Sequence, residues 1–225
     1  MNRRLHPLYT AIFLMLATLT VGAQDQVKLK FLSFPRTVNP QPVELLIGED
    51  KTLAVEAPTN ALSQSHVVPR LSTWAVGETV TNDEGESRFN LFGSAPSIQS
   101  DSQIILIIRN GASNSDGVEI IPIDDQPANF GGGKFLFMNA TQTDIAGECG
   151  GVRFAIRPGE RTIIKPEAGR DDRLFHAMFY FRKEDAPRPF FSSKWPISDK
   201  ARALVFFYHD PNTKQIRLHS IRDFI

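Results

Sequence analysis

Cysteine is nearly absent from this sequence. The chain has a single one, Cys149, so no disulfide can form within it and the fold must rest on an apolar core. The glycines around Cys149 indicate a turn, and no neighbouring His or Lys is placed to activate the thiol. An odd thiol either stays free or forms an intermolecular bridge, and the sequence leaves these two alternatives open.

Helical periodicity is scarce as well. No window longer than about ten residues places apolar side chains at i, i+3, i+4 and i+7. Turn signals instead recur about every ten to fifteen residues, a rhythm typical of all-β folds such as sandwiches. The sequence therefore predicts an all-β protein.

Motifs for catalysis, metals and cofactors are missing. Gly131-Gly132-Gly133 lacks the Lys-Ser/Thr and the helix that a phosphate-binding loop needs, and Ser192-Ser193 has no G-x-S-x-G context. The histidines form no H-x-H or H-x-x-x-H pair. We therefore predict no catalytic residues, no metal and no cofactor. One enzymatic alternative stays open, a hydrolase that uses His176 or His209 with Asp210 in a cleft between two units.

Long hydrophobic runs are limited to the N-terminus. The run from about Ala11 to Val21 follows Arg3 and Arg4, precedes the small-x-small sequence Val21-Gly22-Ala23, and is shorter than the roughly 20 residues of a membrane span. This pattern predicts a signal peptide at residues 1–23 and no stable membrane span after cleavage. It places the mature protein in the periplasm, on the outer surface or in the medium.

The chain also lacks a net charge, but the two signs are unevenly distributed. Residues 24–149 hold 8 basic and 16 acidic groups, net −8, whereas residues 150–225 hold 15 and 9, net +6. Opposite signs favour docking of two units against each other, or a basic face for an anionic partner. Export and the acidic first part both argue against nucleic acid as a partner.

What the chain does contain is an internal repeat at a shift of about one hundred residues. Arg188, Phe191 and Pro196 fall on Arg88, Leu91 and Pro96; Leu204–Tyr208 falls on Ile104–Ile108; and Asp223 falls on Asp125. We interpret the repeat as a tandem duplication. It predicts two β-sandwich-like domains of the Ig-like or Greek-key type, at residues 24–126 and 134–225, with about six strands each.

Further expectations concern how these two domains are built and joined. A proline and three glycines predict a pliable linker at residues 127–133, short enough to let the domains touch. Residues 43–56 and 152–165 each read as a hairpin, and residues 57–70 as a long loop. The runs Ile104–Ile108 and Leu204–Tyr208 are apolar on both faces, so we expect both to be covered on both sides, most simply by the other domain.

The second domain holds the candidate binding residues. Along Leu174–Lys183, odd positions form an apolar face and even positions an amphipathic one, and further aromatic residues follow nearby. Aromatic side chains either build the core of a small domain or offer flat surfaces to a sugar ring or a peptide. The candidate ligand-binding residues are His176, Tyr180, Arg182, Trp195 and His209.

Several motifs resemble a family of exported bacterial β-proteins of unknown function. They are Val152–Glu160 with its Pro-Gly-Glu turn, the segment Pro189–Pro196 with Ser-Ser-Lys-Trp-Pro, Arg202, and the terminal Arg222-Asp223. The resemblance covers mainly residues 134–225 and implies export and a β-sandwich-like fold, without an activity or catalytic residues. We therefore expect an exported, non-catalytic protein that binds a protein or glycan of the cell envelope, with a glycan-binding module and the hydrolase as alternatives.

Overall fold

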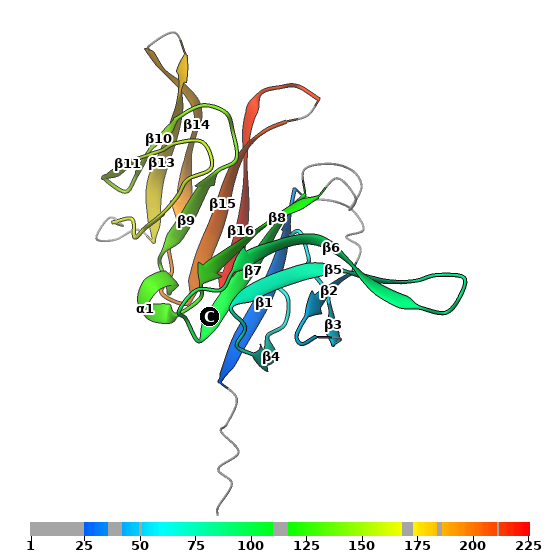
Figure 1. Cartoon of the computed structure of the whole chain (residues 1–225). Helices are drawn as coiled ribbons and strands as arrows, with labels where there is room; N and C mark the ends of the chain where they lie inside the picture. The colour runs from blue at the N-terminus through cyan, green and yellow to red at the C-terminus, as the bar shows by residue number, and fades with distance from the viewer. Residues whose placement is uncertain are drawn as a thin grey trace, which may run out of the picture.

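The computed structural model describes residues 25–35, 42–49, 51–109, 117–167, 173–183, 186–210 and 212–225. The predicted signal peptide, residues 1–23, lies outside the described residues. The described chain is nearly all β, with strands β1–β16 and one short helix, α1 (Figure 1). Within it, no helix has the length and hydropathy that a membrane span requires.

The first half, residues 25–124, consists of two four-stranded sheets. Sheet A has the order β4-β1-β7-β8 and sheet B the order β3-β2-β5-β6. The strands are β1 (Gln26–Phe34), β2 (Val43–Leu46), β3 (Thr52–Val55), β4 (His66–Pro69), β5 (Thr73–Thr81), β6 (Ser87–Pro96), β7 (Ser102–Arg109) and β8 (Val118–Asp124).

The second half, residues 135–225, repeats this architecture. Sheet C has the order β12-β9-β15-β16 and sheet D the order β11-β10-β13-β14. The strands are β9 (Phe135–Asn139), β10 (Ile145–Cys149), β11 (Val152–Ile156), β12 (Arg161–Ile164), β13 (Leu174–Lys183), β14 (Ala186–Pro196), β15 (Ala201–His209) and β16 (Ile216–Phe224). Each strand of the first half has a counterpart eight strands later, and β1–β7 and β9–β15 are both parallel pairs.

Two strand assignments made from the sequence are wrong. The described residues form eight strands in each half rather than about six. Strand β4 lies inside the predicted loop 57–70, and β10 was not predicted. Residues 152–165 are not a hairpin: β11 pairs with β10 in sheet D, whereas β12 crosses to pair with β9 in sheet C. The tight turn is instead at Gly150-Gly151, where both residues have positive φ (54° and 79°), as a two-residue hairpin turn requires.

Each half has its own core between its two sheets. The alternation in β1 shows how this arises: Val27, Leu29 and Phe31 point into the core of the first half, while Leu32 and Phe34 face the opposite side of sheet A. In β15 the residues Ala203, Val205 and Phe207 point into the core of the second half, and Leu204 and Phe206 face away. Sheets A and C are thus apolar on both faces.

A third core joins the halves where sheet A packs on sheet C. Ile104, Leu106, Leu204 and Phe206 are all fully buried there, and the Phe34 and Phe206 rings stack at 4.9 Å. This confirms the prediction that both apolar runs are covered on both sides. The cover of each run is the sheet of the other half.

A buried ionic cluster closes one end of this interface. The Arg202 guanidinium donates to the carboxylates of Asp125, from the first half, and Asp223, at 2.9 Å, and to the Phe130 carbonyl at 2.5 Å. Arg202 is 3% exposed and Asp125 6%. Asp125 also accepts from the Ser102 hydroxyl at 2.8 Å and lies 3.4 Å from the Lys30 ammonium. The two aspartates are the residues that the repeat places on each other.

The segment between the halves packs into the third core through Phe130. Helix α1 (Pro127–Phe130) begins with proline at its first turn, and Phe130 is fully buried in the third core under the Arg202 guanidinium, 4.6 Å from its ring centre. The predicted pliability of residues 127–133 stays a prediction. The domain boundaries themselves stay a prediction.

Candidate functional site

The two halves differ at one edge of the sandwich, between β6 and β8 in the first half and between β14 and β16 in the second. In the first half this edge is closed. A Cβ on Gly93 of β6 would lie 2.3 Å from the Val118 carbonyl oxygen of β8, so only glycine permits the two strands to approach this closely. Next to it Ala95, small and 8% exposed, pairs with the buried Trp74.

In the second half the same edge is open. The pairing of Val76 with Gly93 corresponds to that of Ala177 with Ser193, and the pairing of Trp74 with Ala95 to that of Phe175 with Trp195. A larger side chain therefore stands at both positions of β14. Between β14 and β16 lies a cleft of about 230 Å³ lined by Phe135, Phe191, Trp195, Pro196, Ser198, Ala201, Arg202, Ala203, Leu218, Ser220 and Arg222.

The cleft has an aromatic wall and an apolar floor. The Trp195 ring is half-buried; it stacks on Phe135 at 6.0 Å and meets Phe191 edge-on at 5.6 Å. Ala203 and Leu218, from β15 and β16, belong to the core of the second half or pack against it. The cleft thus exposes one side of the core of the second half. In the first half the close contact of β6 with β8 covers the corresponding side of the core.

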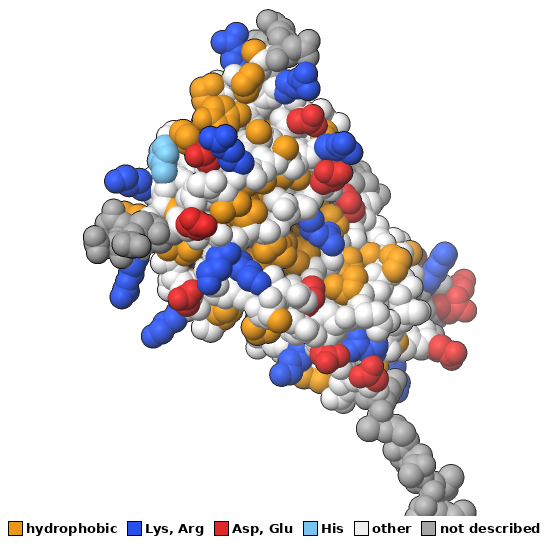
Figure 2. All heavy atoms as spheres, turned by 90° about the vertical axis from the view of Figure 1, so that its left-hand side faces the viewer, with side chains coloured by type: hydrophobic (Ala, Val, Ile, Leu, Met, Phe, Trp, Pro, Cys, Tyr) orange, Lys and Arg blue, Asp and Glu red, His pale blue; other side chains and the backbone are white. Residues whose placement is uncertain are grey.

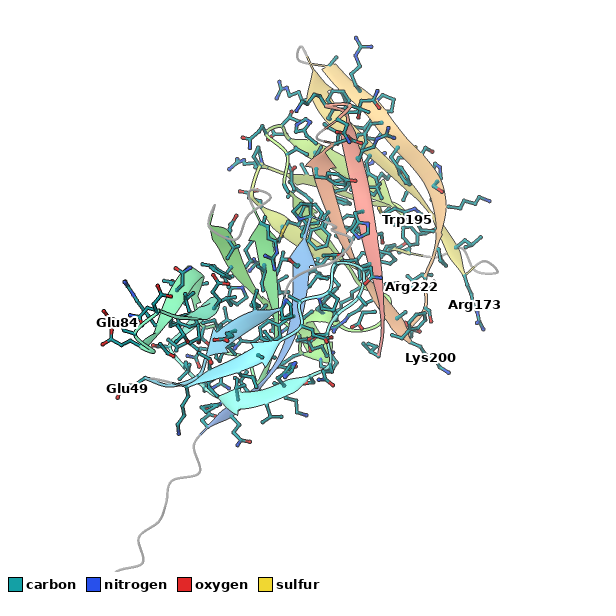
Figure 3. All side chains as sticks on the ribbon, turned by 90° about the vertical axis from the view of Figure 1, so that its right-hand side faces the viewer. Glu49, Glu84, Arg173, Trp195, Lys200 and Arg222 are labelled. Carbon is teal, nitrogen blue, oxygen red and sulfur yellow. The ribbon has the colours of Figure 1, made fainter. Side chains whose placement is uncertain are left out.

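The polar groups of the cleft are hydroxyls and cations. Ser198 and Ser220 line it, and Arg202 reaches it while bonded to its two carboxylates. The Arg222 side chain is exposed, and its guanidinium carbon lies 5.5 Å from the centre of the Phe224 ring. Among the described residues it has no hydrogen bond or ion pair. Figure 3 shows Trp195 and Arg222 close together between β14 and β16, with Arg173 and Lys200 on the same side of the molecule.

Two other predicted site residues, Arg182 on β13 and His209 on β15, lie at the far end of the second half from the cleft. Arg182 and His209 line a second hollow, of about 670 Å³, together with Phe190, Ile216 and Arg217. The His209 ring lies 3.3 Å from the Lys214 carbonyl oxygen across a tight turn. The structure therefore brings Arg182 and His209 to one hollow and Trp195 to the neighbouring cleft.

His176 and Tyr180 are not part of either hollow. The alternation along β13 is as predicted: Phe175, Ala177 and Phe179 are buried, and the even positions lie on the outer face of sheet D. On that face the His176 ring lies 3.0 Å from the Ser192 hydroxyl, and the Tyr180 hydroxyl lies 3.6 Å from the Met178 sulfur. Figure 2 shows this outer side, where hydrophobic side chains lie among basic and acidic ones.

The groups of the hydrolase alternative are held in other roles. Asp210 follows β15 of sheet C, whereas His176 lies on sheet D. The Asp210 carboxylate accepts the backbone N–H groups of Thr213 and Asn212, which lower its pKa, and so it caps a turn. In the described part of the chain, no group of three or more His, Cys, Asp or Glu side chains could hold a metal ion.

Cys149 ends β10 and is fully buried in the core of the second half. Burial, and to a smaller extent the charge of Glu148, raise the pKa of its thiol to about 12. A thiol with so high a pKa is a poor nucleophile at neutral pH.

Of the residues that line the cleft, only Trp195 was among the predicted site residues; those missed include Ser220 and Arg222. These two belong to the inward face of β16, which reads Ile216, Leu218, Ser220, Arg222 and so changes from apolar to cationic along one side. This change is visible in the sequence. Its meaning depends on knowing that β14 stands opposite.

Comparison with known proteins adds no relative. No protein-family model matches the chain, and no curated protein matches it, so the resemblance to exported β-proteins stays a prediction from motifs.

Proposed function

We propose that this chain is an exported, non-catalytic binding protein whose ligand sits in the cleft between β14 and β16. One observation carries the proposal: the second half leaves open, with an aromatic wall, the edge that the first half closes through Gly93 and Ala95. A concave, mostly apolar hollow with a few polar groups is the usual form of a small-molecule site. Export rests on the signal-peptide pattern and on the resemblance of the motifs to exported β-proteins, both taken from the sequence.

The edge strand favours a small ligand over an added peptide strand. Strand β14 contains Pro187, Pro189 and Pro196, and proline has no N–H to offer to a neighbouring strand. Prolines on an edge strand are a common device against pairing with another chain. A partner of the kind that extends a sheet is therefore disfavoured at this edge.

The surroundings of Trp195 also favour an apolar ligand over a glycan. Sugar binding by an aromatic ring needs an exposed face with hydrogen-bonding groups around it. Trp195 is instead half-buried among Phe135, Phe137 and Phe191. The glycan-binding alternative therefore has less support from this geometry than an apolar ligand has.

A neutral apolar dye such as Nile red tests the proposal. We expect saturable binding to the full-length mature protein, followed by dye fluorescence, and loss of binding in Ser220→Trp, which fills the cleft from an exposed position. The matched control is Ser192→Trp, also exposed and on β14, but outside the residues that line the cleft. Equal binding by Ser220→Trp and the wild type would show that the cleft is not the site.

A further inference from the structure

We infer that the ligand of this cleft is a small apolar anion, an aromatic or short aliphatic group that carries one acidic head. This inference rests on the proposed function and names its substrate class. It depends on three properties of the cleft, which are its size, the charges that line it and the position of Arg222.

The volume sets the size of the apolar part. A dry cavity of roughly 150 Å³ holds a benzene molecule, and drug-sized ligands occupy roughly 300–1,000 Å³. The cleft, at about 230 Å³, lies between these values. It accommodates one ring with a short chain, in contact with Trp195 and Leu218.

The charges that line the cleft have one sign. No Asp or Glu lines it, whereas Arg202 and Arg222 both do. The Arg202 guanidinium is already bonded to Asp125 and Asp223, and with the Lys30 ammonium 3.4 Å from Asp125 this cluster has no net charge. Arg222 has no carboxylate partner among the described residues, which leaves one cation unmatched at the cleft.

Comparison of the halves shows that Arg222 is specific to the open edge. The pairing of Ile104 with Ile123 corresponds to that of Leu204 with Ile221, so Arg222 stands where the first half has Asp124. The Asp124 carboxylate is satisfied by the Ser100 hydroxyl at 2.7 Å and the Gln126 N–H at 2.9 Å. The closed edge thus ends in a hydrogen-bonded anion, and the open edge in an exposed cation without a carboxylate partner among the described residues.

Arg222 suits an acidic head because its planar guanidinium binds a carboxylate through two parallel hydrogen bonds. The side chains Ile216, Leu218, Ser220 and Arg222 follow one another on the inward face of β16. A ligand whose apolar part lies against Leu218 and Trp195 therefore directs its head toward Ser220 and Arg222. Ser220 can donate a further hydrogen bond.

A charge series of one ligand tests the inference. Phenylbutyrate, phenylbutanol and phenylbutylamine share the ring and chain and differ in the charge of the head. With the mature wild-type protein, we expect phenylbutyrate to bind about tenfold more tightly than phenylbutanol, because a charge-assisted hydrogen bond adds about this factor at a partly exposed site. Phenylbutylamine should bind more weakly than both. Calorimetry and quenching of Trp195 fluorescence measure the affinities, with Trp195→Phe to separate its signal from that of Trp74.

Two variants with the same change of charge make the test specific. In Arg222→Gln the affinity for phenylbutyrate should fall about tenfold, to that of phenylbutanol, while the affinity for phenylbutanol stays the same. In Arg217→Gln, on the same strand but outside the cleft lining, both affinities should stay the same.

Equal affinity of the wild type for phenylbutyrate and phenylbutanol would overturn the inference and leave the binding function standing. An equal loss in Arg217→Gln and Arg222→Gln would also overturn it, since the general positive charge of this half would then be the cause. Absence of saturable binding for all three compounds, together with absence of Nile red binding, would overturn the proposed function itself.

Discussion

Replacing Arg202 by methionine tests how the two halves are held together. The substitution keeps an unbranched apolar stem and removes the guanidinium, whose charge two carboxylates share in a site where Arg202 is 3% and Asp125 6% exposed. Removal of one partner of a buried ion pair costs about 3–5 kcal/mol, chiefly because the remaining charge is buried without a partner. Asp125 keeps the Ser102 hydroxyl and the more distant Lys30 ammonium, so we expect the lower end, about 3 kcal/mol.

The assay is urea unfolding at pH 7 with thermal melting beside it. For a chain of this size, 3 kcal/mol corresponds to a fall in Tm of roughly 6–12 °C. Arg217→Met is the matched control, because this guanidinium is half-exposed and 4.0 Å from Asp210, and surface pairs contribute about 0–1 kcal/mol.

A second substitution separates charge from packing. Asp125→Asn on the Arg202→Met background removes the unpaired buried charge, so part of the lost stability should return, with a coupling of about 1–3 kcal/mol. A loss below about 1 kcal/mol in Arg202→Met, or no recovery with Asp125→Asn, would refute the argument that a buried uncompensated carboxylate is what destabilises the variant.

Three further predictions concern the scaffold. Gly93→Ala places a Cβ 2.3 Å from the Val118 carbonyl oxygen and should lower the free energy of unfolding in urea by about 1–3 kcal/mol. The control Gly48→Ala, with its nearest contact at 3.6 Å, should be near neutral, and equal stabilities of the two variants would contradict the close approach of β6 and β8. Asn139→Ala removes donors to the Thr143 and Ile156 carbonyl oxygens in a fully buried site and should cost about 2–3 kcal/mol by the same measurement, with the exposed Asn90→Ala as the control that should change little. The Cys149 thiol should resist a thiol reagent at pH 8 until the protein unfolds, and rapid labelling of the native protein would contradict its burial. Because the pKa of the thiol is raised from 9.0 to about 12, its contribution to the free energy of unfolding is full below pH 9 and is lost as the pH rises toward 12.

The scaffold was largely predictable from the sequence because its signals are local. The alternation in β13 and the turns rich in glycine and proline are patterns of a few neighbouring residues. The repeat is found by aligning the two copies of the sequence with each other. The two-faced apolarity of Ile104–Ile107 and Leu204–Phe207 even predicted the interface, since a strand with no solvated face must be covered twice.

Strand partners were less predictable. The β11–β12 connection looks like a hairpin because Pro158-Gly159-Glu160 makes a turn, yet a turn alone does not decide which sheet the next strand joins. The cleft was not predicted from the sequence for a similar reason. The exchange of Gly93 and Ala95 for Ser193 and Trp195 was visible as a difference between copies, but it opens an edge only because β8 and β16 stand opposite these residues. Arg222 looks like any solvated arginine until its surroundings are known.

The apolar outer face of sheet A has a consequence for how the protein is made. Synthesis at about 5–20 residues per second leaves the first half complete for roughly 5–20 s before the last hundred residues exist. During that interval Leu32, Ile104 and Leu106 have no sheet C to cover them, and Asp125 has no Arg202. If the first half folded early, it would therefore expose an apolar surface on which neighbouring nascent chains could aggregate. We expect the nascent chain to be kept unfolded by chaperones until release, and residues 25–126 expressed alone to aggregate.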